Sequence, residues 1–432
     1  KYTGQREELV KNLPHSKVLH TIDEREQICD NCGSTMVKVG EEFVRTEVQF
    51  IPAKLKVIDH YRETYECRSC RKNGTPYMEK APVPYPPVLH SLASASTITW
   101  LIHQKFELSI PLYRQEKEWE ALGLRLSRAT MSNWLLIVYR DWLVHIVHRL
   151  KLELLKQRYL HIDETHVQVL KEPGRKNTSD SYMWVYCSIR DAVNPIRYFE
   201  YQPGRSGKYP EAFLREYEGY IHTDAYSGYN AVSGVKRCLC YTHLRRAFVD
   251  ALPKDIHNSE ASKPAEAILR LNQLFNIESE LEALPPDQKK KERLIREKPL
   301  LEAFWSWAEK SAIGELPKSK LSKAFHYALN NREGFWNYLE DGNCSISNSL
   351  AENCIRPFVI GRKNWLFSGS PKGAEASAGI YTLVETAKAN GLAPMKYIKY
   401  ILSDMPGSAF LEHPEYLDDY LPWNPLVKEF CR

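Results

Sequence analysis

Alternating hydrophobic and polar positions predict a run of β-strands in the middle of the chain. In residues 159–165 the two kinds of position alternate, which is the two-residue period of a strand. Asp163 and Glu164 are therefore expected on opposite faces, so only one of them can join a site on a given face. A helix is predicted near residues 209–217, and further strands are predicted at residues 182–189, 196–201 and 219–223.

Hydrophobic residues at helical spacing predict a helical region before these strands, at about residues 91–150. Within it, residues 112–121 form one predicted helix, Gly123 marks a turn, and Ser127 caps a second helix. This spacing is typical of a helix-turn-helix module, although an ordinary helical hairpin has the same pattern. The polar residues of the second helix that are available to touch DNA are Arg128, Thr130, Ser132 and Asn133.

A second helical region is predicted at roughly residues 261–339. It is charged, and it lies between Asp224 and Glu352, where the chain is far longer than one strand and one helix require. We therefore expect an all-helical insertion. Its lysine run at residues 289–291 is expected to be a solvated helix face, with DNA contact as the alternative.

Four cysteines near the start of the chain predict a zinc site. They form two Cys-x2-Cys pairs, Cys29 with Cys32 and Cys67 with Cys70. Each pair makes a tight turn that presents two thiolates, and two such turns complete a closed tetrahedral site. A disulfide pair is the alternative, which a reducing compartment disfavours. Residues 43–50 and 54–62 alternate as two strands would, so we expect a structural Zn²⁺ in a zinc-ribbon-like domain.

Length, composition and charge limit the class of protein. With 432 residues, of which 43% are hydrophobic, two to four globular domains are expected. A net charge of +5 is mild and argues against a polycation that coats nucleic acid. The absence of an apolar stretch of about 18 residues and of a secretory leader predicts a cytoplasmic protein without membrane contact. The chain opens at Lys1 without a methionine, which indicates that a further segment precedes it.

Three acidic residues have the local structure that two-metal phosphodiester chemistry needs. Asp163 lies in a predicted strand, Asp224 ends another before the turn residues Ser227 and Gly228, and Glu352 lies on a predicted helix. Such acids can converge on two divalent ions that clamp the attacking and leaving oxygens of a phosphate. Mg²⁺ suits such a site because it takes few carboxylates and completes its octahedron with water and phosphate.

Each acid also has a structural explanation. Asp224 is placed to be a turn residue that bonds its own backbone. Glu352 follows Ser349 at the spacing of a capping box, and its helix is expected to stop or kink near Pro357. Asp163 has the alternative of a surface charge pair. The residues alone leave these alternatives open.

The segments around the three acids resemble a known family. Together with Gly361-Arg-Lys-Asn-Trp-Leu-Phe-Ser368 and Glu385-Thr-Ala-Lys-Ala-Asn-Gly391, they are similar to the DDE transposases of bacterial insertion sequences of the insertion-sequence-66 type. The resemblance runs from the paired cysteines to Leu421-Pro-Trp-Asn424. It implies that Asp163, Asp224 and Glu352 are the catalytic triad of a ribonuclease H-like fold. The chain departs from the common pattern at residues 347–349, where relatives often show Asp-Asn-Asn.

The resemblance implies a multi-domain α/β protein with a ribonuclease H-like core, an all-helical insertion, a zinc-ribbon-like domain and a helix-turn-helix-like region. The expected divisions are zinc-binding domain 1–80, proline-rich linker 81–90, helical DNA-binding region 91–155, core 156–260 and 341–400, insertion 261–340 and C-terminal segment 401–432. The zinc domain is expected to bind the ends of the element, with a purely structural role as the alternative.

The implied activity is cleavage at the ends of an insertion sequence, followed by joining of the 3′-hydroxyl to target DNA. Two Mg²⁺ or Mn²⁺ ions are the expected cofactors, beside the structural Zn²⁺. The expected partners are terminal repeats, target DNA, further copies of this chain and accessory proteins of the same element, in a nucleoid-associated cytoplasmic location. The alternatives are a zinc-containing DNA-binding protein without catalysis and a ribonuclease H-like nuclease that does not join strands.

Basic stretches follow two of the three acids, where a DNA backbone would lie. Arg356, Arg362 and Lys363 are candidates to hold phosphates, and Trp365 is a candidate to stack on an unpaired base, with a core position as its alternative. A solvated surface is the alternative for the basic residues.

Cys240 and His243 form a further, weaker Cys-x2-His pair. Two ligands do not complete a metal site, and the sequence offers no obvious partners. A structural role near the active site is therefore favoured over a metal.

Overall fold

The computed structural model describes residues 11, 16–21, 23, 25, 27, 29, 31–32, 34–45, 54–253 and 262–432. The chain divides into two compact units, Lys1–Lys54 and Leu55–Arg432. In the first unit, the backbone N–H of Cys29 donates to the carbonyl of Ser34 at 2.9 Å and that of Met36 donates to Gln27 at 2.8 Å. These bonds close a turn around the first cysteine pair.

The second unit begins with a small hairpin that carries the second cysteine pair. Strands β1 (Thr64–Glu66) and β2 (Met78–Lys80) are antiparallel, and helix α2 (Arg68–Lys72) lies between them. The strands predicted on sequence alternation at residues 43–45 and 54–62 are not found, and residues 46–50 lie outside the described residues. Residues 54–62 are exposed and meet no partner strand. Alternation describes two faces, but a strand also needs a neighbour for its backbone groups.

The remaining strands form one mixed sheet. They are β3 (Tyr159–Val169), β4 (Asp180–Ser188), β5 (Arg197–Gln202), β6 (Gly219–Thr223), β7 (Val235–Leu239) and β8 (Phe367–Ser368). The strand order is β5-β4-β3-β6-β7, and β8 pairs with the far end of β3. The first three strands run antiparallel to one another, whereas β6 and β7 run parallel to β3. The predicted strands are thus found, and β7 and β8 are additional.

The helices of the second unit lie before, within and after the sheet, and one group is inserted between α8 and α14. Those before the sheet are α3 (Ala95–Ile102), α4 (Leu112–Ala121), α5 (Arg128–Val138) and α6 (Val144–Leu155). Within and beyond the sheet lie α7 (Lys208–Phe213), α8 (Tyr241–Val249), α14 (Ser349–Trp365), α15 (Pro371–Ala389), α16 (Pro394–Asp404) and α17 (Pro425–Cys431). The inserted helices are α9 (Lys263–Glu280), α10 (Pro286–Arg296), α11 (Lys298–Ser311), α12 (Lys320–Asn330) and α13 (Arg332–Trp336).

Helices α4 and α5 confirm the predicted pair, and the Ser127 hydroxyl caps α5 by accepting from the N–H of Thr130 at 3.1 Å. Short π-helical turns extend α3 through His103–Glu107 and α5 through Tyr139–Leu143. Both turns contribute to packing around α15.

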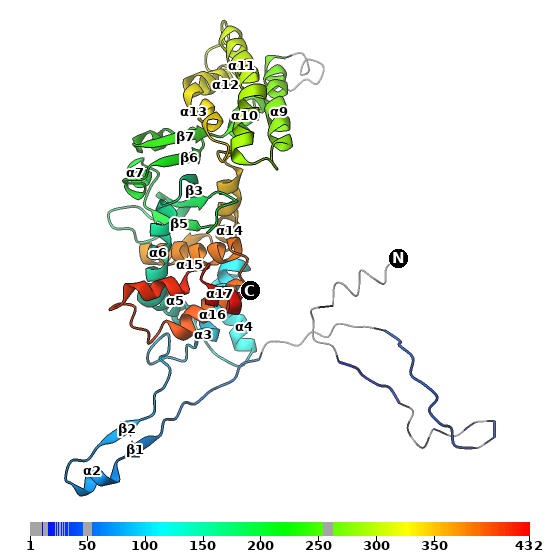
Figure 1. Ribbon diagram of the computed structural model, residues 1–432, viewed down its shortest axis with the longest axis vertical. Helices are drawn as coiled ribbons and strands as arrows, with labels where there is room; N and C mark the ends of the chain where they lie inside the picture. The colour runs from blue at the N-terminus through cyan, green and yellow to red at the C-terminus, as the bar shows by residue number, and fades with distance from the viewer. Residues whose placement is uncertain are drawn as a thin grey trace. The chain divides into compact units, whose positions relative to one another are not determined.

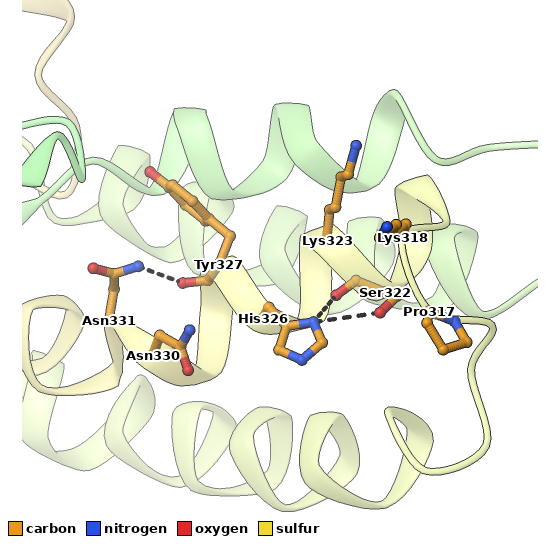
Figure 2. Close-up of a pocket in the computed structure, with 8 residues that line it drawn as sticks. All are labelled: Pro317, Lys318, Ser322, Lys323, His326, Tyr327, Asn330 and Asn331. Carbon is orange, nitrogen blue, oxygen red and sulfur yellow. Dashed lines mark hydrogen bonds between the residues drawn. The ribbon is translucent and has the colours of Figure 1, made fainter.

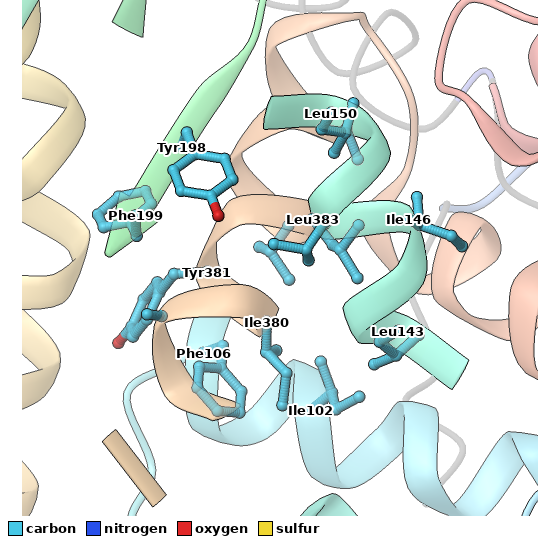
Figure 3. Close-up of a cluster of buried hydrophobic side chains, with 14 of the residues drawn as sticks. Ile102, Phe106, Leu143, Ile146, Leu150, Tyr198, Phe199, Ile380, Tyr381 and Leu383 are labelled. Atoms are coloured by element: carbon cyan, nitrogen blue, oxygen red, sulfur yellow. The ribbon is translucent and has the colours of Figure 1, made fainter. Parts of the chain in front are cut away.

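Two clusters of buried side chains hold the second unit together. The first joins the sheet to α3–α6 and to the C-terminal helices, and Figure 3 shows its centre, where α6, β5 and α15 meet around Leu150, Phe199 and Leu383. The second joins β6, β7 and α8 to the inserted helices. In Figure 1 the sheet lies between these two helical groups, and α14 runs beside it.

Candidate active site

Asp163 occupies the middle of the central strand β3, directly across from Val185 of β4. The backbone N–H of Glu164 donates to its Oδ1 at 2.9 Å. Burial raises the pKa of Asp163 to about 7. Neighbouring carboxylates add to this rise, and they belong to Glu164, Asp224 and Glu352. Asp163 therefore lies in a region of concentrated negative charge.

Asp224 follows the last residue of β6, which runs parallel to β3. Its Oδ1 accepts a hydrogen bond from the backbone N–H of Tyr226 at 2.9 Å, so it closes the turn that its sequence position predicted. Arg237 fixes this turn by donating to the carbonyls of Asp224 and Tyr226 at 2.6 and 2.8 Å. The turn role leaves Oδ2 available, and the Nη2 of Arg205 lies 3.9 Å from that oxygen.

Glu352 lies in the first turn of α14, and this helix packs across β3 and β4. The capping-box alternative is not found, because Asn348 is the N-cap residue and no side chain caps the helix. The helix also does not stop near Pro357 but continues to Trp365. The carboxylate Oε1 is buried without a hydrogen-bond partner in the described part of the chain. Glu352 is therefore not explained as a helix cap.

Asn348 is a residue that the sequence analysis did not assign to the site. Its Oδ1 accepts from the Nδ1–H of His161 at 2.9 Å, and its Nδ2 donates to the carbonyl of Ile162 at 2.7 Å. Its backbone N–H donates to the Sγ of Cys240 at 3.1 Å. The start of α14 is thus attached to β3 just before Asp163. The sequence feature that could have drawn attention to Asn348 is the segment Ser347-Asn348-Ser349, which departs from the Asp-Asn-Asn pattern of relatives.

Glu164 points to the opposite face of β3, as the alternation predicted. Its side chain is nearly completely buried and pairs with Arg205 at 2.6 Å. The hydroxyl of Tyr229 also donates to it. Arg205 in turn lies over the ring of Tyr226, 3.9 Å from its centroid. Glu164 is therefore the buried member of an ion pair whose partially exposed arginine also lies near Asp224.

The three predicted acids come from separate elements: β3, the turn after β6 and the first turn of α14. The charges of Asp224 and Glu352 each add to the rise in the pKa of Asp163, after burial and the neighbouring Glu164. The comparisons with known proteins identify the family of the chain. A family model described as "Transposase IS66 family" matches residues 90–376, which is more than half of the chain and includes all three acids.

The chain belongs to the IS66 transposase family. A second model, described as the "zinc-finger binding domain of transposase IS66", matches residues 26–71 and thus spans both cysteine pairs. The two family matches therefore support a transposase role for this chain and a structural zinc ion in its zinc-finger domain.

Three proteins of Sinorhizobium fredii (strain NBRC 101917 / NGR234) are similar along most of the chain, and all three are described as uncharacterized. The protein y4hP is 26% identical over 416 residues, which cover 91% of this chain and 73% of y4hP. The protein y4jD is 26% identical over 430 residues, which cover 96% of this chain and 81% of y4jD. The protein y4qI is 27% identical over 434 residues, which cover 95% of this chain and 76% of y4qI.

The cysteine pairs of this IS66 family member lie in different units, and each pair is closed locally. The Cys32 thiol is in hydrogen-bond contact with Cys29, and the Cys67 thiol is in contact with Cys70. Hydrogen bonds to the Ser34 backbone and side chain and to Cys29 lower the pKa of Cys32. Each pair thus has the tight geometry that favours two thiolates at one ion.

The predicted DNA-contact residues fall into two groups. Arg356, Lys363, Arg128 and Asn133 are exposed, the first two on α14 and the others on α5. Arg362 instead reaches β3, where it donates to the Thr165 hydroxyl at 2.9 Å and to the His166 carbonyl. Trp365 is half-buried and packs against the ring of Phe358 at 5.4 Å. Only the first group is fully available to a DNA backbone.

Cys240 and His243 lie at the start of α8 and meet a partner that the sequence analysis did not foresee. One ligand atom of each, together with a carboxylate oxygen of Glu352, lies within 4.8 Å of the others. The Nδ1 of His243 is 3.7 Å from the Oε1 of Glu352. Sequence spacing could not reveal this group because tertiary packing supplies its third member.

A shallow pocket lies on the insertion, along α12 (Figure 2). Lys318, Lys323 and His326 line it, and the Nδ1 of His326 lies 2.7 Å from the carbonyl of Ser322. None of the three acids lines this pocket. Tyr327 also lines the pocket; burial raises the pKa of its hydroxyl and the charge of Asp224 raises it further, so one wall of the pocket lies near the Asp224 turn. No helix in the described ranges is long and apolar enough to cross a membrane.

Proposed function

We propose that this protein is a DDE transposase that cleaves the ends of an insertion sequence and joins the resulting 3′-hydroxyl to target DNA. The observation that carries the proposal is the cluster formed by Asp163, Asp224 and Glu352. Each acid comes from a different element, and the charges of Asp224 and Glu352 contribute, after burial and Glu164, to the raised pKa of Asp163. A surface charge pair does not require such a convergence.

We infer that the catalytic core has the ribonuclease H-like fold. The support is the strand order β5-β4-β3-β6-β7, in which an antiparallel meander is followed by two parallel strands. In this arrangement one acid lies in the central strand and the second at the end of its parallel neighbour. The helix that carries the third acid packs against the same central strand. The inserted helices, α9–α13, come between the second and third acids.

The chemistry of the three carboxylates suits a pair of divalent ions. Asp163, Asp224 and Glu352 would hold Mg²⁺ or Mn²⁺ through oxygen ligands, which these ions prefer. The orphaned Oε1 of Glu352 and the raised pKa of Asp163 are the expected properties of carboxylates that lack a cation. When bound, such ions stabilise charge on the attacking and leaving oxygens of a phosphate.

The residues around the acids would orient them and hold the DNA. The Arg237 hydrogen bonds fix the Asp224 turn, and Asn348 fixes the first turn of α14. Arg356 and Lys363 are exposed on α14 and would hold phosphates of the DNA backbone. Asp163 must lose its proton to act as a ligand. Protonation of Asp163 competes with metal binding, so we expect the Mg²⁺ concentration needed for activity to rise as the pH drops below about 7.

The remaining parts would bind DNA and assemble the complex. We infer that Cys29, Cys32, Cys67 and Cys70 hold one structural Zn²⁺ in a domain that binds the element's ends. Helices α4 and α5 would form a helix-turn-helix module that presents Arg128 and Asn133. Copies of this chain and accessory proteins of the same element are the expected partners.

A strand-transfer assay on labelled DNA that carries the element's ends tests the proposal. The variants are Asp163→Asn, Asp224→Asn and Glu352→Gln, with Mg²⁺ or Mn²⁺ as the cofactor. We expect each to lose joined product by at least about 100-fold while it still binds the ends. Asp191→Asn is the matched control, because Asp191 is an exposed carboxylate in the turn after β4.

The other outcomes separate the alternatives. Cleavage without joining would favour a nuclease, and tight end binding without cleavage under either metal would favour a DNA-binding protein. Cleavage that persists in all three variants would show that the catalytic residues lie elsewhere.

A further inference from the structure

A second set of possible ligands lies beside the three acids and shares one of them. Cys240 is buried at the N-cap of α8, and His243 and Glu352 are half-buried. One atom from each lies within 4.8 Å of the other two. The set differs from the acid cluster in kind, because it combines sulfur, nitrogen and oxygen.

Two of these atoms are unusually available. The Nδ1 of His243 and the Oε1 of Glu352 are both buried, and neither has a hydrogen-bond partner among the described residues. They lie 3.7 Å apart, which is too far for a hydrogen bond. A buried polar atom without a partner is costly, so such atoms usually mark a missing ligand, ion or water.

Hydrogen bonds of Asn348 hold the elements that carry the three residues in fixed positions. Cys240 and His243 lie on the first turn of α8, and the backbone N–H of Asn348 donates to the Cys240 Sγ at 3.1 Å. The Asn348 side chain attaches the start of α14 to β3. The three ligand atoms therefore come from elements of fixed relative position.

The donor set selects the class of ion. Thiolate and imidazole favour Zn²⁺, whereas Mg²⁺ and Mn²⁺ prefer oxygen. A histidine nitrogen and a carboxylate oxygen about 2.0–2.2 Å from a tetrahedral ion are roughly 3.3–3.5 Å from each other, so the 3.7 Å between His243 Nδ1 and Glu352 Oε1 requires only a small approach. Three protein ligands leave a fourth position open, as in zinc sites that exchange their outer ligand.

A second group of nitrogen and sulfur ligands, in the same unit, is less suitable for binding a metal ion. His222, Cys238 and Cys344 are all buried close together. However, the Nε2 of His222 accepts from the backbone N–H of Ser345 at 2.8 Å, and its Nδ1 lies 3.2 Å from the carbonyl of Leu160. Both nitrogens already have partners, so this imidazole has no free lone pair for a metal.

We propose that Cys240, His243 and Glu352 form a zinc site that withdraws Glu352 from the acid cluster, so that Zn²⁺ inhibits the enzyme. Binding displaces the thiol proton of Cys240 and involves no redox change. The proposal that Zn²⁺ inhibits the enzyme rests on the proposed strand-transfer activity. The proposal that Zn²⁺ binds at these three residues does not.

Metal binding by the full-length chain tests the site directly. The zinc content per chain is measured after dialysis against a fixed free Zn²⁺ concentration, for the wild type, Cys240→Ser and His243→Ala. We expect both variants to retain one zinc fewer than the wild type. Cys431→Ser is the matched control, because Cys431 is a buried thiol on α17 and should leave the zinc content unchanged.

Cobalt provides a second measurement, on chain that holds zinc only at its four paired cysteines before Co²⁺ is added. A thiolate-to-cobalt absorption band should appear in the wild type and be lost or require roughly 10- to 100-fold more Co²⁺ in Cys240→Ser. Equal zinc content and equal cobalt spectra in the wild type and both variants would overturn the site. Loss of the extra zinc in Cys238→Ser but not in Cys240→Ser would move it to the other cluster and would also overturn the proposal.

Inhibition is measured by strand transfer at fixed Mg²⁺, with each variant's rate normalised to its own rate without Zn²⁺. We expect added Zn²⁺ to inhibit the wild type, additional Mg²⁺ to restore the rate, and Cys240→Ser to be less sensitive. Equal inhibition of Cys240→Ser would overturn the inhibitory link. If the wild type joins no DNA at all, the proposed function fails while the zinc measurement still decides the site.

Discussion

At the scale of single residues, Asn348 determines where the helix-borne acid lies. Its side chain uses both a donor and an acceptor on consecutive residues of β3, His161 and Ile162. The ring of His161 also stacks on that of His222 from β6, with centroids 4.2 Å apart. One amide thus connects α14 to the two strands that carry the aspartates.

We expect Asn348→Ala to impair joining more than DNA binding. The substitution leaves buried polar atoms of β3 unpaired, which costs about 1–3 kcal/mol of stability. A shift of the first turn of α14 would also misplace Glu352, and misplacement by about 1 Å lowers rates roughly 100-fold. The strand-transfer rate and the affinity for the element's ends are measured together, at a temperature where the variant is folded.

Ser347→Ala is the matched control for this prediction. The Ser347 hydroxyl bonds only to Ser349 at 3.0 Å among the described residues, at the surface. It should leave both quantities near the wild-type values. A normal joining rate in Asn348→Ala would show that α14 is held by its packing alone.

At the scale of elements, α15 completes the open edge of the sheet. Strand β5 lies at one end of the strand order, so its outer backbone groups have no strand partner in the described part of the chain. The hydroxyls of Thr382 and Thr386 on α15 accept from the backbone N–H groups of Phe199 and Arg197 at 2.8 and 3.1 Å. A helix thus protects an edge that would otherwise be free to pair with another strand.

We expect Thr382→Val to destabilise the protein by about 1–3 kcal/mol, because the buried N–H of Phe199 then has no acceptor. Urea denaturation measures the loss, and hydrogen exchange should show faster exchange of the Phe199 amide. Ser377→Ala on the same helix is the matched control, since its hydroxyl bonds within α15, to the carbonyl of Gly373. Equal stability of the two variants would contradict the edge-protecting role.

At the scale of the whole molecule, the proposed active site lies where two hydrophobic clusters meet. Most of β3 and α14 belongs to the first cluster, whereas β7, α8 and the inserted helices belong to the second. Burial raises the pKa of Tyr327 on α12, and the charge of Asp224 raises it further, so the insertion reaches the acid cluster. Neither cluster includes a residue before Val88.

Removal of zinc should therefore lower the protease resistance of the segment that carries the paired cysteines more than that of the helices and sheet that follow it. None of the described residues of the cysteine segment belongs to the buried clusters, so its order is expected to depend on metal. We expect a zinc chelator to expose bonds before residue 81 to limited proteolysis while residues 88–432 stay resistant. End binding should weaken in parallel. Unchanged cleavage of the cysteine segment would contradict a stabilising zinc.

The sequence predicted most of the sheet because its strands are buried in alternation or throughout. Strand β7 was not predicted, because Lys236 and Arg237 interrupt its apolar pattern. The Arg237 side chain instead donates a hydrogen bond to the carbonyl of Asp224, a contact that the sequence pattern does not reveal. The three acids were predicted from local structure and the family resemblance. The contact between His243 and Glu352 was not, because residues far apart in sequence meet only when α8 and α14 pack.

Helix α14 is fastened to one strand at both of its ends. Asn348 holds the beginning of the helix to β3 at Ile162, and β8, directly after the helix, pairs with β3 at Gln168 and Val169. Arg362 adds a third attachment to the same strand. Strand and helix must therefore move as a single piece. The Asp224 turn is connected to the same strand, because Arg205 lies against both Asp224 and Glu164 of β3, so the three acids share one continuous framework.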